Sequence, residues 1–215
     1  MNDFNRSLQD LRESYDRAPL RRSDLSGDPV VQFQRWMQDA VEAGIYDPNA
    51  CSLATVDSSG RPCARAVLLK GLEGARFVFY SNYNSRKALH LEGNPNVSMH
   101  FPWFSLQRQV TILGETCQVE DHLAEEYFHS RPYLSQIGAW ASLQSQPLDS
   151  RETLEKAFLK AKERFGDSPP RPSHWGGYYL DPRSIEFWQG GPNRLHDRFI
   201  YERTDDQWKI NRLNP

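Results

Sequence analysis

The feature that most constrains the fold is a series of short segments with strand-like periodicity that follow one another with only turns between them. Three such segments are predicted at residues 52–56, 64–70 and 77–81, and an Asp-Ser-Ser-Gly turn at residues 57–60 joins the first two. Strands that are joined by tight turns pair antiparallel, whereas parallel strands need a longer crossover. The pattern therefore favours an antiparallel sheet.

The rest of the chain adds further strands and several helices. Strands are expected near residues 97–101 and 106–119 and in a meander over 177–213, with one turn at Asp181-Pro182. Helices are expected at residues 85–92, 121–130 and 151–165, and another begins at Asp28-Pro29. Asp149 and Glu152 resemble a capping box for the helix at 151–165.

These elements predict an α+β fold that is mainly β, with an antiparallel barrel and peripheral helices. A doubly wound parallel sheet fits poorly, because strict alternation of strands and helices is missing. The sequence contains neither a GxGxxG fingerprint nor a P-loop.

Composition indicates a single globular domain at residues 28–215, preceded by a flexible N-terminal arm at residues 1–27. No apolar run approaches the ~18 residues of a membrane span, and the first 20 residues are too polar for a secretory signal. Three cysteines without a CxxC pair and six histidines without metal-ligand spacing argue against a disulfide framework and a metal site. These features together indicate a soluble protein of a reducing compartment, so a cytoplasmic location without a membrane partner is expected. The net charge of −2 gives no electrostatic bias toward nucleic acid, so no nucleic-acid partner is expected.

A basic segment near the C-terminus is the first candidate site. If residues 194–198 form a strand, then Arg194, His196 and Arg198 share one face. A Gly-rich turn precedes this segment, and a hairpin would bring it back beside Trp188. Three nitrogen-rich side chains on one face need an anionic or electron-rich partner, which indicates a ligand site. An exposed edge strand with solvated charges is the alternative.

A second candidate lies at a helix start. Ser85 is expected to cap the helix at 85–92, which places Arg86 and Lys87 in its first turn. Cations there oppose the helix dipole, and a bound phosphate would reverse that effect. The alternative is a pair of solvated first-turn cations.

A third candidate is Arg65, which lies in an otherwise apolar strand and is expected to be partly buried and paired. The alternative to a ligand is a salt bridge to a carboxylate such as Glu115. Lys70 would face the opposite side of the strand from Arg65 unless a bulge or the strand end reorients it.

A fourth candidate combines a phenol, a guanidinium and a hydroxyl. Tyr127 and Arg131 are four residues apart on a predicted helix, and Ser135 follows shortly after. Such a set suits a phosphate monoester, which takes a bidentate cation and neutral donors. An ordinary Tyr–Arg surface stack is the alternative.

Several of these motifs occur together in one known order. They lie at residues 65–70, 84–87, 108–110, 127–132, 135–140, 144–145, 186–189 and 194–198. With them the chain resembles the pyridoxine/pyridoxamine 5′-phosphate oxidases of the FMN-binding split-barrel group, from about residue 28 to residue 215.

The resemblance implies a homodimer with FMN at the subunit interface and assigns residues to the cofactor and the substrate. The residues implied for FMN are Arg65, Ala66, Val67, Leu68, Leu69, Lys70, Tyr80, Ser81, Arg86, Lys87, Gln109, Gln144, Ser145, Trp188 and Arg198. Those implied for the substrate are Arg12, Tyr15, Lys70, Tyr127, Arg131, Ser135, Arg194, Leu195 and His196. Arg194 and His196 are the implied catalytic pair, which we expect to position the substrate rather than to act as obligatory bases.

The implied reaction is the oxidation of pyridoxine and pyridoxamine 5′-phosphates to pyridoxal 5′-phosphate. Oxygen would accept the electrons and give hydrogen peroxide, and the amine substrate would also release ammonia. One alternative is an FMN oxidase of another aromatic compound, such as a phenazine precursor. Another is a module that binds FMN or pyridoxal phosphate without catalysis.

Overall fold

The structure is a computed structural model that describes residues 14–205 and 207–215. Its internal contacts divide the chain into two compact units. Unit 1 comprises Met1–Pro48, Phe101–Thr111 and Ser184–Pro215, and unit 2 comprises Asn49–His100 and Ile112–Arg183. The assignment of residues 28–215 to a single domain stays a prediction, and Arg12 of the expected arm lies outside the described residues.

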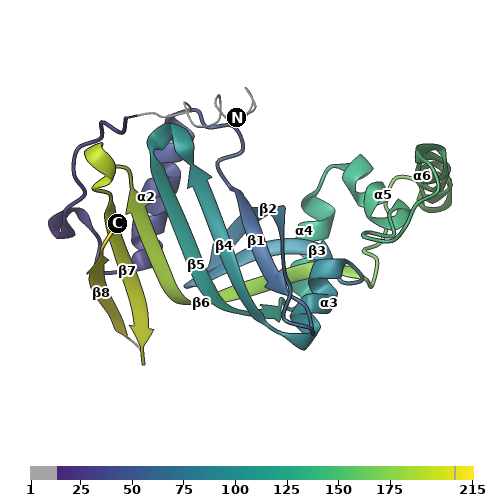
Figure 1. The fold of residues 1–215 in the computed structure, drawn as a ribbon. Coiled ribbons are helices and arrows are strands. Elements are labelled where there is room, and N and C mark those ends of the chain that lie inside the picture. The colour runs from purple at the N-terminus through teal and green to yellow at the C-terminus, as the bar shows by residue number, and fades with distance from the viewer. Residues whose placement is uncertain (1–13, 206) are drawn as a thin grey trace, which may run out of the picture. The chain divides into compact units, whose positions relative to one another are not determined.

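Six strands form the barrel, which is closed by a pairing between its first and last members (Figure 1). They are β1 (Ala50–Val56), β2 (Pro62–Glu73), β3 (Arg76–Asn82), β4 (Asn96–Trp103), β5 (Arg108–Gln118) and β6 (Trp175–Gln189). Their order is β3-β2-β1-β4-β5-β6, and β3 also pairs with β6. Closure removes free strand edges and confirms the predicted antiparallel α+β barrel.

Burial of alternate side chains explains why β1 is a strand, since Leu53 and Thr55 are fully buried between half-buried neighbours. Strand β3 is buried on both faces, because Phe77, Val78 and Phe79 are all buried. In β2 the register with β3 shifts between Leu69 and Gly71. This bulge falls at Lys70. A bulge is one of the two features that could turn Lys70 toward the side of the strand that Arg65 faces.

Strand β6 is longer than the sequence suggested, because no turn forms at Asp181-Pro182. Its pairing with β3 ends at Leu180, and its pairing with β7 (Asp197–Thr204) begins at Ser184. Pro182 lies between these two pairings, where its missing N–H removes no ladder bond to either strand.

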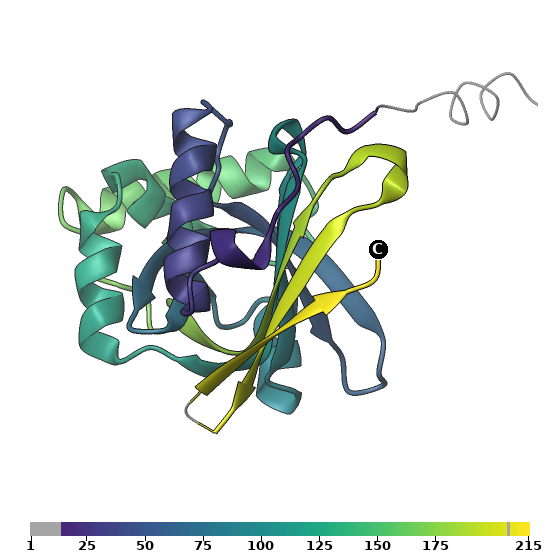
Figure 2. The same ribbon diagram turned by 90° about the vertical axis from the view of Figure 1, so that its left-hand side faces the viewer.

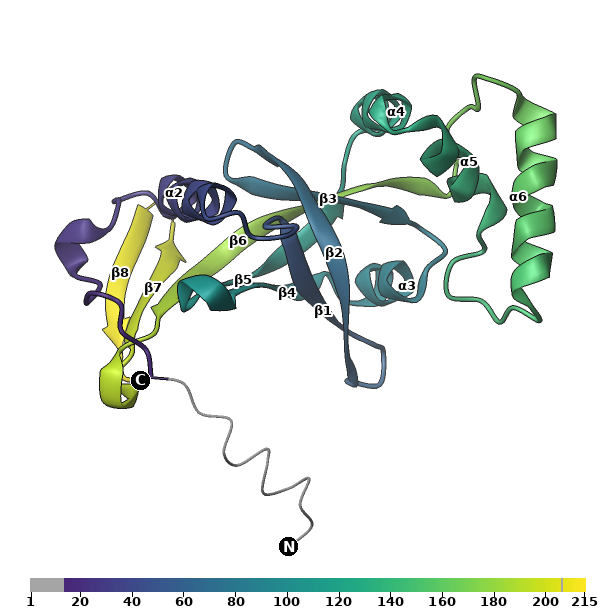
Figure 3. The ribbon, with the colours of Figure 1, turned by 90° about the horizontal axis from the view of Figure 1, so that it is seen from above.

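Four helices belong to unit 2: α3 (Arg86–Gly93), α4 (Asp121–Ser130), α5 (Tyr133–Ala141) and α6 (Arg151–Phe165). The views agree that α5 lies between α4 and α6 (Figures 1 and 3). The sequence did not predict α5, since Pro132 was read only as a stop. Pro132 is in fact the N-cap of α5, and its carbonyl accepts hydrogen bonds from the Ser135 and Gln136 N–H groups.

The cap of α6 also differs from the prediction. Ser150 is the N-cap, and its hydroxyl accepts a hydrogen bond from the Thr153 N–H at 3.2 Å. The expected capping box of Asp149 and Glu152 is therefore wrong, because the serine stands one residue closer to the helix.

Unit 1 is built on helix α2 (Pro29–Glu42) and the strands β7 and β8 (Gln207–Leu213) (Figure 2). Asp28 caps α2 as predicted and accepts a hydrogen bond from the Val30 N–H at 2.7 Å. The buried face of α2 brings Trp36 against Phe187 with ring centroids 5.2 Å apart. These edge contacts join the helix to the sheet of this unit.

The basic segment at residues 194–198 is not a strand over its whole length, which corrects the expected alternation. Arg194 ends a short 3-10 turn (Pro192–Arg194) and has a positive φ of 63°, and β7 begins only at Asp197. Arg194, His196 and Arg198 therefore do not share a face by strand geometry. The predicted hairpin is present, because Arg198 pairs directly opposite Trp188.

We predict that Gly114→Ala weakens unit 2. A Cβ at this position in β5 would lie 2.1 Å from the carbonyl oxygen of Asp181, so the backbone of β5 or β6 would have to shift. Overpacking of this kind costs about 1–3 kcal/mol, which urea denaturation would show as a lower midpoint. Gly93→Ala is the matched control, since a Cβ there meets nothing within 4 Å. Equal stability of the two variants would contradict this account of the close approach.

Candidate functional site

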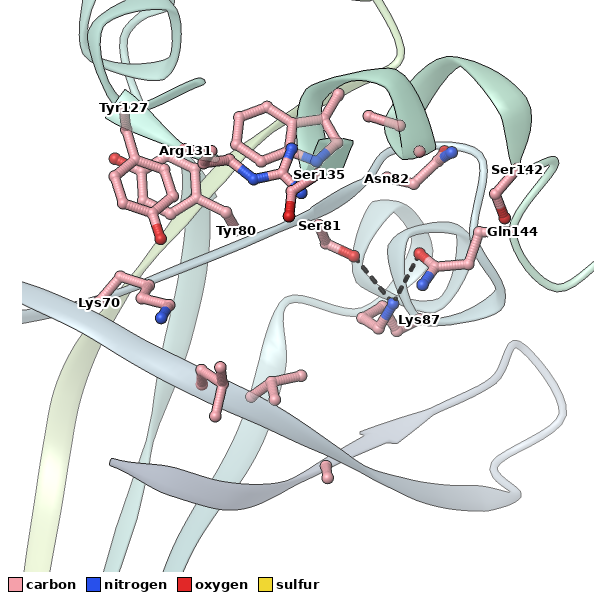
Figure 4. A pocket seen from close by; sticks show the side chains of 16 residues that line it. Lys70, Tyr80, Ser81, Asn82, Lys87, Tyr127, Arg131, Ser135, Ser142 and Gln144 are labelled. Atoms are coloured by element: carbon pink, nitrogen blue, oxygen red, sulfur yellow. Dashed lines mark hydrogen bonds between the residues drawn. The ribbon is translucent and has the colours of Figure 1, made fainter. Parts of the chain in front are cut away.

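Unit 2 contains a cavity of about 500 Å³. Figure 4 shows its side chains, which come mainly from β2, β3, α4 and α5. The lining residues are Ala66, Val67, Leu68, Lys70, Tyr80, Ser81, Asn82, Lys87, Tyr127, Arg131, Ser135, Gly138, Ala139, Ser142, Gln144 and Trp175. Its size is that of a site for a small molecule or cofactor.

The charge of this lining has one sign. Lys70, Lys87 and Arg131 contribute three cations, and no aspartate or glutamate is among the lining residues. Cationic side chains at such a site favour an anion, because no carboxylate of the lining neutralises them. Hydroxyl and amide groups from Ser81 and Gln144 add neutral donors.

Lys87 is buried, with 8% of its surface exposed. Its Nζ donates hydrogen bonds to the Ser81 Oγ at 2.8 Å, the Ser85 Oγ at 3.2 Å and the Gln144 Oε1 at 3.2 Å (Figure 4). Burial, and secondly the positive charge of Arg65, lowers the pKa of Lys87 to about 8. The ammonium group is thus held by neutral oxygens alone and would gain from a nearby anion.

Arg131 follows the last residue of α4 and has a donor without a partner. Its Nη1 is the one buried side-chain nitrogen or oxygen of the described residues that makes no hydrogen bond. The guanidinium carbon lies 4.6 Å from the centroid of the Trp175 ring. Burial lowers the pKa of Arg131. An unsatisfied buried donor of a charged group costs more than ~1–3 kcal/mol, which a bound anion would offset.

Aromatic rings form one wall of the cavity. Tyr80 and Tyr127 stack with centroids 3.8 Å apart, and Tyr80 also stacks on Trp175 at 5.4 Å. The alternative of a Tyr127–Arg131 surface stack is therefore not what the structure shows. The guanidinium lies against Trp175 and Tyr127 lies against Tyr80.

Arg65 is partly buried, as expected, but its partner is not a carboxylate. Its Nη1 donates to the Leu53 carbonyl at 2.9 Å and to the Thr55 Oγ1 at 2.8 Å. Glu115, the partner suggested from sequence, forms an ion pair with Arg183 at 2.6 Å instead. That alternative for Arg65 is therefore wrong.

The loop after α5 meets the start of α3. The Arg86 N–H donates to the Ser145 Oγ at 3.2 Å, and Ser145 has a positive φ of 71°. Ser85 occupies the N-cap position as predicted but makes no side-chain capping bond, because its hydroxyl accepts from Lys87. The first turn of α3 thus keeps free N–H groups for a ligand or solvent.

The residues implied for FMN fall into three groups. Those that line the cavity are Ala66, Val67, Leu68, Lys70, Tyr80, Ser81, Lys87 and Gln144. Those of unit 2 outside the lining are Arg65, Leu69, Arg86 and Ser145. Those of unit 1 are Gln109, Trp188 and Arg198.

The residues implied for the substrate divide in the same way. The cavity brings together Tyr127, Arg131 and Ser135, the fourth candidate of the sequence, with Lys70, which the resemblance added to this set. Tyr15, Arg194, Leu195 and His196 belong to unit 1. The cavity also contains Asn82, Gly138, Ala139, Ser142 and Trp175, which sequence reasoning missed because α5 was not predicted and none belongs to a charged motif.

In unit 1 three rings pack together. His196 lies 4.7 Å from Trp188 and 5.5 Å from Tyr15, centroid to centroid. Its Nδ1 accepts a hydrogen bond from the Gly191 N–H at 3.2 Å, and burial followed by the charge of Arg194 lowers its pKa. The imidazole is thereby biased toward its neutral form.

Arg198 has a partner within its own unit. Its Nε donates to the Glu186 Oε1 at 2.8 Å and its Nη2 to Oε2 at 3.1 Å, a bidentate pair. The sequence argument overlooked this carboxylate two residues before Trp188. The charge of Arg198 is thus neutralised locally and does not by itself require a ligand.

Metal sites and membrane-spanning helices can be assessed in the described part of the chain. Within residues 14–205 and 207–215 no group of three His, Cys, Asp or Glu side chains could hold a metal ion. None of the helices in those same residues is long and apolar enough to cross a membrane.

Comparisons with known proteins give the family. Residues 37–165 match the family described as pyridoxamine 5′-phosphate oxidase, and residues 175–215 match the pyridoxine 5′-phosphate oxidase C-terminal dimerisation region. The chain is 50% identical over 212 residues to a pyridoxine/pyridoxamine 5′-phosphate oxidase of Burkholderia lata, covering 97% of this chain and 99% of the relative. The pyridoxine/pyridoxamine 5′-phosphate oxidase of Bacteroides thetaiotaomicron is 48% identical over 212 residues, covering 98% of this chain and 100% of the relative.

Among solved structures, PhzG from Burkholderia lata, in complex with tetrahydrophenazine-1-carboxylic acid, has a TM-score of 0.88. It is 29% identical, and the alignment covers 94% of this chain and 100% of PhzG. The matches over most of the chain and the relatives at about half identity agree on one assignment. The chain belongs to the pyridoxine/pyridoxamine 5′-phosphate oxidase family of enzymes.

Proposed function

We propose that this enzyme uses FMN to oxidise pyridoxine 5′-phosphate and pyridoxamine 5′-phosphate to pyridoxal 5′-phosphate. The relatives named pyridoxine/pyridoxamine 5′-phosphate oxidase support the two substrates of this proposal. Oxygen accepts the electrons and yields hydrogen peroxide, and the amine substrate releases ammonia as well. The observation that carries this proposal is the unpartnered Nη1 of Arg131 in a cavity without carboxylates. A phosphate monoester supplies the acceptor that this donor lacks.

The cavity has room for two anionic groups at separate places. In Figure 4, Lys70 and Tyr127 lie on one side of the view and Lys87 and Gln144 on the other, with Arg131 and Ser135 between them. We assign the substrate phosphate to the set of Lys70, Tyr127, Arg131 and Ser135. We assign the flavin phosphate to the end with Lys87 and Ser81, near Arg65 and Arg86. The residues present therefore fit both groups.

When bound, FMN supplies an acceptor for the hydride that leaves the C4′ carbon of the substrate. The protein binds and orients the flavin and the substrate, and it excludes water from them. The strand from Arg65 to Lys70 lines the cavity through Ala66, Val67 and Leu68, which suits the flat apolar face of a ring system.

We place the unit 1 residues at the same site through assembly of a homodimer with FMN at the subunit interface. The match of residues 175–215 to a dimerisation region supports this assembly. In it Gln109, Trp188 and Arg198 complete the flavin site. Arg194 and His196 position the pyridine ring of the substrate, and the neutral imidazole of His196 offers a hydrogen-bond partner rather than a strong base. A cytoplasmic location stays a prediction.

One observation favours a second function. PhzG, a structural neighbour at 29% identity, is in complex with tetrahydrophenazine-1-carboxylic acid, and a carboxylate would also pair with Arg131. We prefer the phosphate substrate, because Lys70, Tyr127 and Ser135 line the cavity with Arg131 and supply more donors than one carboxylate takes. The alternative of a non-catalytic binding module predicts no repeated turnover.

We predict that Arg131→Met raises the KM for pyridoxine 5′-phosphate by roughly 10–100-fold, because each hydrogen bond to a charged group contributes about 1.5–3 kcal/mol. Steady-state kinetics with the phosphorylated and the unphosphorylated substrate measure the effect, which is expected only for the former. Arg151→Met is the matched control, since Arg151 is 86% exposed and pairs with Glu155 on α6. The same loss with both substrates would argue against a phosphate role for Arg131.

We also predict a pH dependence of FMN binding. The pKa of Lys87 in the free protein is lowered to about 8, so Lys87 is charged below this pH and loses its charge as the pH rises through it. The FMN phosphate is a dianion throughout, since its second pKa is about 6. Affinity should therefore be level near pH 7 and fall above pH ~8 by up to about tenfold per pH unit.

Flavin fluorescence quenching, measured from about pH 7 to 9.5, checks this dependence. Lys87→Met should bind FMN more weakly at pH 7 and should lose the additional fall above pH ~8. A wild-type affinity that stays constant over the whole range would show that the Lys87 charge does not contribute to flavin binding.

A further inference from the structure

A buried hydroxyl lies between an arginine and a histidine in unit 2, outside the lining of the cavity. Thr55 in β1 is fully buried, and its Oγ1 accepts a hydrogen bond from the Arg65 Nη1 at 2.8 Å. The same oxygen lies 3.0 Å from the Nδ1 of His90 in α3. The three side chains thus form a chain of polar contacts from α3 through β1 to β2.

The strand register explains how Arg65 reaches this position. Arg65 pairs with Leu53 across β1 and β2, and Thr55 lies two residues further along the same face of β1. The guanidinium bends along β1, and both of its hydrogen bonds, to the Leu53 carbonyl and to Thr55, use Nη1. Within the described part of the chain this leaves its Nε and Nη2 for a ligand.

The Thr55 hydroxyl keeps a lone pair toward Arg65 in either tautomer of His90. A threonine hydroxyl has one proton and two acceptor positions, and one of these positions is taken by Arg65. If the proton goes to the Cys63 carbonyl at 3.5 Å, the second acceptor position takes a proton from the Nδ1 of His90; if the proton goes to that Nδ1 at 3.0 Å, His90 is the acceptor. In both arrangements the contact with His90 restricts the rotation of the hydroxyl and leaves Arg65 its acceptor.

Helix α3 also carries Lys87, the second cation near Arg65. Lys87 and His90 are three residues apart on α3 and therefore lie on one face of the helix. Lys87 points its ammonium group to Ser81 and Gln144, while His90 reaches Thr55. One face of α3 thereby carries Lys87 itself and reaches Arg65 through Thr55. Neither of these two cations meets a carboxylate in these contacts.

We propose that Thr55 and His90 are positioning residues that hold the Arg65 guanidinium in place for the phosphate group of a bound flavin. This inference rests on the proposed function and adds to it two residues that lie outside the cavity lining. Neither residue touches the ligand. Their effect is to restrict Arg65 to one orientation before binding, which lowers the entropy lost when the phosphate is captured.

The test compares the affinity of the apoprotein for FMN and for riboflavin, which lacks the phosphate, by flavin fluorescence quenching. Thr55→Val keeps the shape of the side chain and removes the acceptor. We expect it to weaken FMN binding on the order of tenfold and to change riboflavin binding less than about twofold. Thr55→Ser should restore the affinity for FMN. Thr116→Val is the matched control, since the Thr116 hydroxyl donates to the Pro95 carbonyl at 3.2 Å and contacts neither Arg65 nor His90 in the described structure.

A second pair of variants covers the case in which Thr55→Val does not fold. His90→Asn retains a side chain that can donate to or accept from Thr55, and His90→Leu removes that group. The leucine variant should lower the ratio of FMN to riboflavin affinity several-fold, and the asparagine variant should keep it. Thermal melting of each apoprotein separates loss of folding from loss of phosphate recognition.

The outcomes separate this inference from the proposed function. Thr55→Val or His90→Leu that folds and keeps the wild-type preference for FMN over riboflavin overturns the positioning role alone. Equal losses for FMN and riboflavin overturn it as well, since they indicate a general structural effect. A wild-type protein that does not prefer FMN over riboflavin overturns the phosphate site and with it the proposed function.

Discussion

Burial of positive charge without carboxylate partners is the constraint on which the rest of this site depends. Lys87 keeps its ammonium group on three neutral oxygens, and Arg131 has a buried N–H without an acceptor among residues 14–205 and 207–215. Both arrangements cost free energy in the empty protein, because desolvation of a cation is only partly repaid by neutral groups. Natural proteins retain such costs at places where a ligand offsets them. The cations of the cavity therefore lack counter-ions in the protein itself, and an anionic ligand would supply them.

The fold of unit 2 supplies the rigid parts that hold these cations. Closure of the barrel by the β3–β6 pairing fixes the strand that presents Tyr80 and Ser81. The bulge at Lys70 changes the register of β2 at the point where the strand lines the cavity. Helix α3 adds Lys87 and, three residues later, His90. Each cation of the lining stands where a regular element begins, ends or bulges: Lys87 in the first turn of α3, Arg131 directly after α4 and Lys70 at the bulge of β2.

Much of this arrangement could be predicted from the sequence. Hairpin-type turns between alternating segments predict the antiparallel barrel, and helical spacing predicts the grouping of Tyr127, Arg131 and Ser135 that the cavity shows. The place of Lys70 beside them followed only from the family resemblance. Helix α5 was missed because a proline that blocks one helix can also cap the next, and local sequence does not distinguish the two. The basic segment after Trp188 was read as a strand, since its alternation is regular, yet the positive φ of Arg194 interrupts it. The Glu186 partner of Arg198 and the Thr55 partner of Arg65 lie on neighbouring strands, so they depend on register.

Binding of a phosphorylated substrate for repeated oxidation in the carboxylate-free cavity is tested by the hydrogen peroxide formed per bound flavin when the FMN-loaded protein is given pyridoxine 5′-phosphate under air. We expect many equivalents of peroxide, matched by pyridoxal 5′-phosphate, and far less with unphosphorylated pyridoxine at the same concentration. Peroxide that stops at one equivalent per flavin would show that the protein does not turn over, and peroxide that forms equally well from pyridoxine would show that the cavity does not recognise the phosphate.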